Sequence, residues 1–427
     1  MKRIIRDGRV VDPATRTDAV MDVLLNGGRI EAIGARIDAP GAAVFDASGL
    51  IVAPGFIDMH VHLREPGQTH KETIVTGARA AARGGFASIC AMPNTIPVND
   101  CPEITAFVRN AARDADVRVF PIAAMTRDSQ GSEPTDQAAL LAAGAVAFSD
   151  DGRCVQSAAV MRRVMEAAAA ANALIIDHCE DRSLSGNGVI NDGEVSRRLN
   201  LPGIPAAAED VMVARNIILA EATGCRVHIA HLSTRGSVRL VGEAKRRNLP
   251  VTVEVMPHHL LLTETELLGG DPNFKMNPPL RGKEDVQALI AAVRNGDIDV
   301  FATDHAPHAA AEKALGLERA PFGIVGLETA VSLLLDRLVR PGLISLDRFI
   351  AMWSTRPAEI LGWPSKGRLE AGADADLTLL DLDDTFVVDP SRFASLGRNT
   401  PFGGWVLRGA PVATIVGGRL VHTDVPC

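Results

Sequence analysis

The chain has 427 residues, of which 47% are hydrophobic, and a formal net charge of −8 at pH 7. This acidic balance and the lack of a long Lys/Arg run exclude a general nucleic-acid binder and favour a small-molecule ligand. The first residues lack the apolar core of a secretory signal, and no later apolar run reaches membrane-spanning length. We therefore expect a soluble, cytoplasmic protein with no membrane partner.

Short β-branched runs separated by turn signals occupy the first fifty residues and return near the C-terminus. Examples are MDVLLNGGRIEAIG near the start and PVATIVGGRLV near the end. Both ends are typical of antiparallel strands, and they could pair with each other. We predict a small β-sandwich domain formed by residues 1–52 together with residues 366–427.

Between these ends, apolar runs of strand length alternate with Ala-rich stretches of helical spacing. The runs are IVAPGFIDMH, FASICAM, VRVFPIAAM, AVAFSDD, ALIIDH, RVHIAHLS, VTVEVMPHH and IDVFATDHAPH. Runs that are apolar on both faces suit strands packed on the inside and covered by helices on the outside. We predict an α/β fold with a (β/α)8 TIM-like barrel over residues 53–365. A doubly wound open sheet is the alternative, because a sequence does not show closure.

Side chains with metal-ligand chemistry occur where several of these strands end, which is where barrel enzymes carry their active sites. His60 and His62 are two residues apart, so they would project to one face of the first strand and chelate one cation. Other strand ends supply Asp151, His178, His231 and Asp304. Four histidines and two carboxylates suffice for two divalent ions. The mixture suits zinc best, with manganese, cobalt or iron as substitutes.

Two carboxylates stand side by side at the end of the fourth run, AFSDDG. Adjacent residues of a strand face opposite ways, so Asp150 and Asp151 cannot both point into the barrel. Like charges at this spacing repel each other, so a solvated turn, an arginine or a metal must hold at least one of them ionised. Strand parity alone does not say which of the two faces the predicted metal site.

Six motifs, in this order and spacing, resemble the dihydroorotases of the amidohydrolase superfamily: HVHLREPG, AMPNT, FSDDG, NPPLR, TDHAPH and PFGIVGLE. The resemblance covers essentially the whole predicted barrel and both flanking β segments. It implies a hydrolase that interconverts N-carbamoyl-L-aspartate and L-dihydroorotate in de novo pyrimidine (UMP) biosynthesis. It also implies two zinc ions per subunit and a metal-bridging hydroxide that attacks the ring amide carbonyl.

The same resemblance implies a role for each predicted ligand. The first ion would take His60, His62 and Asp304, the second His178 and His231, with Asp151 bridging both. Asp304 would also be the catalytic proton shuttle, and Asp150 a hydrogen-bonded turn residue. Many relatives bridge their metals with a carboxylated lysine instead. Here the only lysine between the HxH motif and His178 is Lys71, far from the fourth strand, so we expect the aspartate branch of the family.

A substrate that carries a carboxylate needs a fixed cationic partner. Arg64 follows His62 by two residues on the same face and suits a bidentate grip. The resemblance adds further substrate contacts, namely Asn94, Asn277, His308, Pro321 and Gly323. We expect residues 309–323 to form either a mobile loop over the site or an ordinary surface helix. No metal role is expected for His70, His228, His258, His259 and His422.

Two other functions stay open on the sequence. A cyclic-amide hydrolase acting on hydantoin, dihydropyrimidine or allantoin would need no partner for a ring carboxylate, so the role of Arg64 discriminates it. A non-catalytic homologue could instead serve as a scaffold for aspartate transcarbamoylase, although such chains typically lack metal histidines that are present here. We also expect a homo-oligomer, with association with aspartate transcarbamoylase as a further option.

Overall fold

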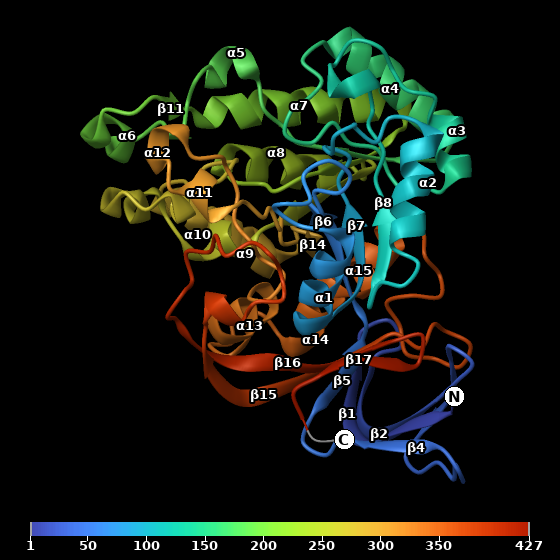
Figure 1. The fold of residues 1–427 in the computed structure, drawn as a ribbon. Helices are drawn as coiled ribbons and strands as arrows, with labels where there is room; N and C mark the ends of the chain where they lie inside the picture. The colour runs from blue at the N-terminus through green and yellow to red at the C-terminus, as the bar shows by residue number, and fades with distance from the viewer. Residues whose placement is uncertain (1, 426–427) are drawn as a thin grey trace.

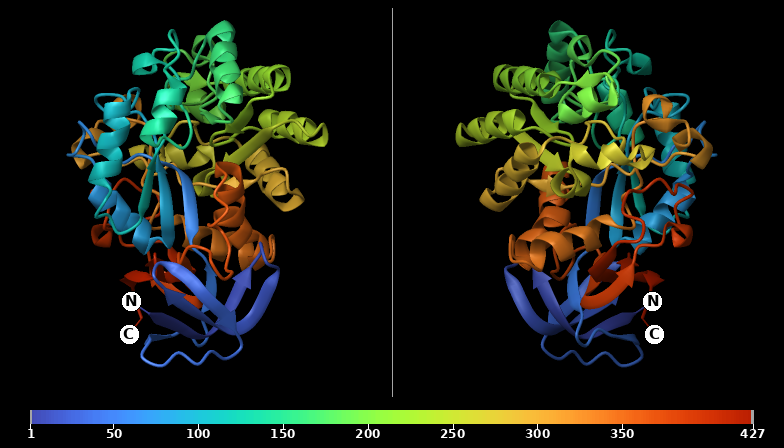
Figure 2. Two further views of the ribbon diagram at one scale, coloured as in Figure 1. Left: turned by 90° about the vertical axis from the view of Figure 1, so that its right-hand side faces the viewer. Right: turned by 90° about the vertical axis from the view of Figure 1, so that its left-hand side faces the viewer.

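A computed structural model describes residues 2–425 of the chain. A β-sheet built from both ends of the chain lies at one end of the molecule, and the helix-rich central part of the chain lies against it (Figures 1 and 2). Within the described residues, no helix is both long and apolar enough to cross a membrane.

Eight strands form a single sheet from the two chain ends, in the order β17-β16-β15-β5-β1-β2-β3, with β4 paired to β1. They are β1 (Arg3–Asp12), β2 (Thr17–Asn26), β3 (Arg29–Gly34), β4 (Ala43–Asp46), β5 (Ile51–Pro54), β15 (Leu377–Val387), β16 (Val406–Val416) and β17 (Arg419–Thr423). Alternate side chains such as Ile5, Val23 and Ile415 pack into one enclosed hydrophobic core. The antiparallel pairing that the sequence predicts joins β1 to β2, β2 to β3, β15 to β16 and β16 to β17, whereas β4 and β5 run parallel to β1.

The run IVAPGFIDMH, expected as one strand, is two strands. β5 pairs with β15 in the terminal sheet, whereas β6 (Phe56–Val61) is the first strand of the barrel. Gly55 lies between them, and a Cβ atom at this position would come within 2.7 Å of the Ala87 side chain. The change of direction therefore requires a residue without a side chain.

The barrel strands are parallel and form a three-stranded and a four-stranded group. The groups contain β6, β7 (Phe86–Ala91) and β8 (Arg118–Pro121), then β9 (Leu174–Asp177), β12 (Arg226–Ile229), β13 (Val251–Val255) and β14 (Val300–Phe301). Phe148 makes bridges to both Ala123 and Ile175, so its segment acts as the fourth strand between the groups. A bridge between Val61 and His305 joins the last strand to the first. The circle is closed, which confirms the (β/α)8 barrel and excludes the open sheet.

Helices surround these strands (Figure 2). The longer ones are α1 (Ile74–Arg83), α2 (Pro102–Ala111), α3 (Gln137–Ala143), α4 (Ala158–Ala170), α7 (Ala206–Thr223), α8 (Arg235–Arg246), α10 (Lys283–Asn295), α14 (Leu346–Trp353) and α15 (Thr355–Leu361). Shorter elements are α5 (Arg182–Ser185), α6 (Glu194–Leu199), α9 (Pro257–Leu261), α11 (Ala310–Lys313), α12 (Gly316–Arg319), α13 (Ala330–Leu334), β10 (Ile190–Asn191) and β11 (Gly203–Ile204). Several begin at side-chain caps; the Thr73 hydroxyl accepts the Thr76 N–H at the start of α1, for example.

An aromatic cluster fills the barrel beside α14. Trp353, at the end of this helix, has its ring centroid 5.1 Å from that of Phe86 and 5.6 Å from that of Phe301. Phe56, the first residue of β6, contacts Trp353 and Phe349 as well. All these rings are fully buried. Their packing ties the barrel strands to the helix that follows the last of them.

Candidate metal centre and active site

Six side chains converge at the carboxyl ends of the barrel strands. His60 lies on β6 and His62 directly follows it, and the others follow four further strands, namely Asp151, His178, His231 and Asp304. All six are buried. The structure thus brings together the whole set of ligands that the sequence predicts, from segments up to 244 positions apart in the chain.

The first group consists of His60, His62, Asp151 and Asp304. The Nε2 atoms of His60 and His62 lie 3.4 and 3.5 Å from the two carboxylate oxygens of Asp151. Asp304 Oδ1 lies 2.9 Å from His62 Nε2 and 3.5 Å from His60 Nε2. Two nitrogens and two carboxylates therefore face one point, a donor set that suits a divalent cation such as zinc.

The second group uses the same aspartate. His178 Nδ1 and His231 Nε2 lie 3.6 and 3.7 Å from Asp151 Oδ1. These two ring nitrogens are only 2.8 Å apart. The donor atoms of His60, His62 and Asp151 lie within 4.8 Å of one another, and so do those of Asp151, His178 and His231, close enough to hold an ion each. Asp151 belongs to both groups, which is the arrangement that a bridging ligand requires.

Outer hydrogen bonds orient three of the histidines. His60 Nδ1 lies 2.7 Å from Glu254 Oε1, His62 Nδ1 lies 2.9 Å from Asn94 Oδ1, and His178 Nε2 lies 3.0 Å from Glu180 Oε2. In each case the outer oxygen accepts a hydrogen bond from the ring N–H. The other ring nitrogen then faces Asp151 and is the atom that a metal would take, as in other metal-binding histidines.

Unpartnered atoms test whether a metal fits. Buried polar atoms normally have hydrogen-bond partners. Among the described residues, His60 Nε2 and Asp151 Oδ1 are buried and have none, although they face each other across the centre of the cluster. A cation between them would satisfy both. The residues present therefore fit a metal site, by their chemistry and by their unsatisfied atoms.

The charges of the cluster shift its pKa values strongly. Burial alone would lower the pKa of His60, but the carboxylates of Glu254, Asp151 and Asp304 outweigh burial and raise that pKa well above its usual value. Burial also opposes protonation of His178, yet hydrogen bonds to Asp151 and Glu180 raise its pKa to about 10. Protons and metal ions therefore compete for the same nitrogens.

The two adjacent aspartates face different surroundings. Asp150 Oδ1 accepts hydrogen bonds from the backbone N–H groups of Met125 and Thr126, at 2.8 and 3.1 Å, and its other oxygen bonds the Thr126 hydroxyl. Burial raises the pKa of Asp150 to about 6. Asp150 thus holds the preceding strand connection, while Asp151 alone faces the histidines. Lys71, the only lysine between the HxH motif and His178, pairs with Glu312 instead, with its Nζ atom 3.0 Å from the Glu312 carboxylate.

Three predicted site residues have strained backbones. Arg64, His231 and Asp304 have φ values of +61°, +31° and +48°, in the left-handed region that non-glycine residues rarely adopt. Such conformations cost about 1–3 kcal/mol each and concentrate at functional sites. The strained backbone therefore occurs at residues whose side chains lie at the barrel mouth.

Arg64 is a buried cation without an acidic partner. Its Nε donates to the Pro307 carbonyl at 3.2 Å, and Nη2 lies 3.4 Å from His308 Nε2. Among residues 2–425 it makes no ion pair. Burial lowers its pKa to about 10, so the guanidinium stays charged at neutral pH. A charged, buried and unpaired arginine beside the cluster suits an anionic group of a ligand.

The other predicted substrate contacts lie around the same mouth. Asn277 donates to Glu180 at 2.8 Å and lies 3.5 Å from His178 Nε2. Asn94 lies between two predicted metal ligands, since its oxygen accepts from His62 and its nitrogen donates to Asp151 Oδ2 at 3.3 Å. Both amide ends of Asn94 are thus engaged by predicted metal ligands.

The segment 309–323 contains two short helices, α11 and α12, followed by Pro321 and Gly323. Gly323 has a φ of +117°, and a Cβ atom there would come within 2.6 Å of the Ala306 side chain. His308 Nε2 donates to the Phe322 carbonyl at 2.8 Å. The backbone of residues 321–323 therefore lies directly against the segment that carries Asp304 and His308.

Sequence reasoning missed Glu254, a fully buried carboxylate that joins two histidines. One oxygen bonds His60, and the other lies 3.2 Å from His228 Nε2. The signal was a single acidic residue in the apolar strand VTVEV. It also missed Glu180, two positions after His178. His228 Nδ1 also lies 2.8 Å from the Thr252 hydroxyl, so both of its ring nitrogens have partners outside the cluster of predicted ligands.

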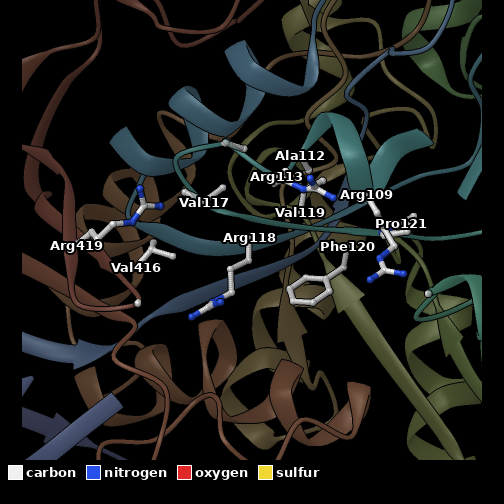
Figure 3. A pocket seen from close by; sticks show the side chains of 13 residues that line it. Arg109, Ala112, Arg113, Val117, Arg118, Val119, Phe120, Pro121, Val416 and Arg419 are labelled. Atoms are coloured by element: carbon white, nitrogen blue, oxygen red, sulfur yellow. The ribbon is translucent and has the colours of Figure 1, made fainter. Parts of the chain in front are cut away.

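A separate hollow lies away from this cluster. Its volume is about 360 Å³. Four arginines and several apolar residues line it, including Arg109, Arg113, Arg118, Arg419, Val119 and Phe120 (Figure 3). Arg118 is already paired with Asp376 at 2.9 Å. None of the predicted metal or substrate residues lines this hollow.

The closed barrel with its shared-aspartate cluster is of the amidohydrolase class, and residues 194–422 match the model of the "Amidohydrolase family". Residues 49–237 match the "Dihydro-orotase-like" model. The chain is 53% identical over 424 residues to a dihydroorotase of Pelotomaculum thermopropionicum, covering 99% of each chain. It is 49% identical over 421 residues to a dihydroorotase of Bacillus cereus strain AH187, covering 98% of each. The chain belongs to the dihydroorotase family.

Solved structures of the same architecture are also similar. An L-hydantoinase from Arthrobacter aurescens has a TM-score of 0.90 at 27% identity, covering 100% of this chain and 97% of that one. A dihydropyrimidinase from Brevibacillus agri NCHU1002 has a TM-score of 0.87 at 26% identity, covering 99% and 95%. These likenesses agree with a barrel that carries a β-sandwich domain.

Proposed function

We propose that this protein is a metal-dependent cyclic amidohydrolase that interconverts L-dihydroorotate and N-carbamoyl-L-aspartate in de novo pyrimidine biosynthesis. The observation that carries the proposal is 53% identity to a dihydroorotase over nearly the full length of both chains, against 27% to the L-hydantoinase. We also propose that the enzyme is cytoplasmic, as expected from the sequence.

We assign the metal ligands as the sequence predicts, with two zinc ions per subunit. The first ion would be held by His60, His62 and Asp304, the second by His178 and His231, and Asp151 would bridge them. Bound zinc would lower the pKa of a water molecule and polarise the ring amide carbonyl. The support for this assignment is the pair of buried, unpartnered atoms, His60 Nε2 and Asp151 Oδ1.

Asp304 would move the proton. Its carboxylate lies at the edge of the cluster, 2.9 Å from His62 Nε2, on the segment that leads to His308. Burial would raise the pKa of Asp304, but the charge of His60 and the hydrogen bond with His62 lower it below its usual range, so the group is a carboxylate at neutral pH. It would take a proton from the attacking water and deliver it to the leaving ring nitrogen.

Arg64 would bind the carboxylate of the substrate. Two hydrogen bonds from one guanidinium fix both the position and the orientation of a carboxylate. His308 lies beside Arg64 and would extend this contact, while Asn277 and the backbone at Pro321 and Gly323 would face the ring amide. Asn94 would reach the carboxylate only by giving up its bonds to His62 and Asp151.

The test compares substrates on the zinc-loaded protein, using dihydroorotate, hydantoin, dihydrouracil and allantoin. Turnover confined to dihydroorotate is expected. Arg64→Met should lower kcat/KM for dihydroorotate about 10²- to 10⁴-fold, because it removes two hydrogen bonds to a charged group and each contributes roughly 1.5–3 kcal/mol. Zinc content should not change, and Arg113→Met, an exposed arginine, serves as the control. Turnover only on the neutral rings would replace the proposal by a hydantoinase or dihydropyrimidinase activity.

We further propose a homo-oligomer, with association with aspartate transcarbamoylase as an option. Neither is needed for the chemistry above, since one chain supplies every proposed ligand. Sedimentation of the purified protein, alone and mixed with a transcarbamoylase, tests both.

A further inference from the structure

A buried lysine holds the backbone beside the proposed substrate site. Lys313, the last residue of α11, is 6% exposed. Its Nζ donates to the carbonyls of Pro321, Gly323 and Lys275, at 3.0, 3.1 and 3.3 Å. An ammonium has three N–H donors, so all of them are used on the backbone. Within residues 2–425, Lys313 makes no ion pair.

The three carbonyls belong to the two segments that would enclose the substrate ring. Pro321 and Gly323 are proposed backbone contacts, and Lys275 precedes Asn277 by two residues. These segments also bond each other directly, since the Gly323 N–H donates to the Lys275 carbonyl at 3.0 Å. The Lys313 ammonium therefore lies where the two segments meet.

A second lysine crosses the same junction. The Nζ atom of Lys275 donates to the Glu318 carbonyl at 3.0 Å and lies 4.6 Å from the centroid of the Phe322 ring. Both contacts reach residues of the 309–323 segment. Two lysine side chains therefore connect this segment to residue 275: Lys313 donates to the Lys275 carbonyl, and Lys275 donates to the Glu318 carbonyl.

Burial makes this arrangement an unusual use of a lysine. Burial, reinforced by the nearby Lys275, lowers the pKa of Lys313 to about 7. An ammonium taken out of water without a carboxylate partner loses hydration that carbonyl dipoles replace only in part. The cost of burial offsets part of what the three hydrogen bonds contribute to stability, and the contacts fix the geometry of the carbonyls that Lys313 joins.

We propose that Lys313 is a positioning residue of the amidohydrolase reaction, which holds the backbone of residues 321–323 against residues 275–277 so that both meet the substrate ring. The inference rests on the proposed function. Lys313 itself would not touch the substrate, because its three donors are occupied.

The test replaces Lys313 with Met, which keeps the length and removes the donors, and with Gln, which keeps two N–H donors. Lys71→Met is the matched control, since Lys71 pairs with Glu312 of the same helix but touches none of these carbonyls. We expect Lys313→Met to raise KM for dihydroorotate about tenfold, with kcat within about threefold and zinc content unchanged, because the loss falls on substrate binding. Lys313→Gln should raise KM less, and Lys71→Met should leave it unchanged.

Hydrogen exchange of the free protein gives a readout independent of turnover. Amides of residues 309–323, including that of Gly323, should exchange faster in Lys313→Met than in the Lys71→Met control. An unchanged KM, or unchanged exchange, in a folded Lys313→Met protein overturns the inference. If Lys313→Met does not fold, an unchanged KM in Lys313→Gln overturns it. If the wild-type protein does not turn over dihydroorotate, the proposed function is wrong. The hydrogen-exchange comparison still tests whether the Lys313 contacts hold the 309–323 segment.

Discussion

Replacing Glu254 with Gln tests whether the outer hydrogen bonds of the cluster control metal binding. Glu254 is fully buried and accepts from His60 Nδ1 at 2.7 Å, from the His231 N–H at 3.1 Å and from His228 Nε2 at 3.2 Å. Burial would raise its pKa, but the charge of His60 and hydrogen bonds from the histidines lower it to about 2, so it is a carboxylate at neutral pH. Gln keeps the shape, removes the charge and turns an N–H₂ group toward at least one donor.

The magnitude follows from the loss of this outer support. Mutating a partner of a metal-binding histidine typically lowers metal affinity by about 10- to 100-fold, which is about 1.4–2.7 kcal/mol. A buried donor left without an acceptor costs a similar amount, about 1–3 kcal/mol. The loss should fall mainly on the ion proposed at His60 and less on the ion at His178, which bonds Glu180 instead.

The assay is stepwise metal removal by a chelator, with zinc counted per subunit and turnover measured at each step. Glu209→Gln is the matched control. Glu209 is also a buried carboxylate and accepts backbone N–H groups of Ser233 and Thr234 at 3.1 Å, but it touches no proposed ligand. Equal chelator resistance in Glu254→Gln and wild-type protein would refute the proposal that Glu254 supports the metal site.

Two further predictions concern the proton shuttle and the metal-free state. Asp304→Asn should bind zinc more weakly but still fold, and kcat should fall about 10²- to 10⁴-fold at saturating zinc; a near-wild-type rate would rule out Asp304 as the shuttle. In the metal-free protein the pKa of His178 is raised to about 10, so its contribution to stability is fully present below about pH 6.5 and is lost as pH rises toward 10. Thermal unfolding of chelator-treated protein should therefore show falling stability over that range, less steeply in His178→Gln; the same slope in both would contradict the assignment.

Strand parity predicted much of the site because the relevant residues lie on regular strands. His60 on β6 and His62 directly after it, two positions apart, present their Nε2 atoms to the same carboxylate. Alternation also required Asp150 and Asp151 to face opposite ways, and they do. The family resemblance was needed to choose Asp151, because alternation is equally consistent with either residue facing inward.

Other features depend on contacts that local sequence does not encode. The turn at Gly55 that separates β5 from β6 is set by the distant Ala87, so an apolar run of ten residues was predicted as one strand. The position of Asn94 between His62 and Asp151 arises from three separate strand ends. Lys313 reads as an ordinary helix lysine in the sequence, and only the folded chain shows the three carbonyls around it.

The charges at the barrel mouth connect the metal proposal with substrate choice. Asp151, Asp304, Glu254 and Glu180 place four negative charges around neutral imidazoles, and two divalent cations would balance them. Without metal, the raised histidine pKa values show that protons supply part of that balance instead. Arg64 then remains as one buried positive charge with no acidic partner in the described chain. A substrate with a single carboxylate neutralises it, whereas a neutral hydantoin or dihydrouracil ring leaves a buried guanidinium unpaired. The electrostatics of the site therefore favour dihydroorotate over the substrates named for the structural relatives.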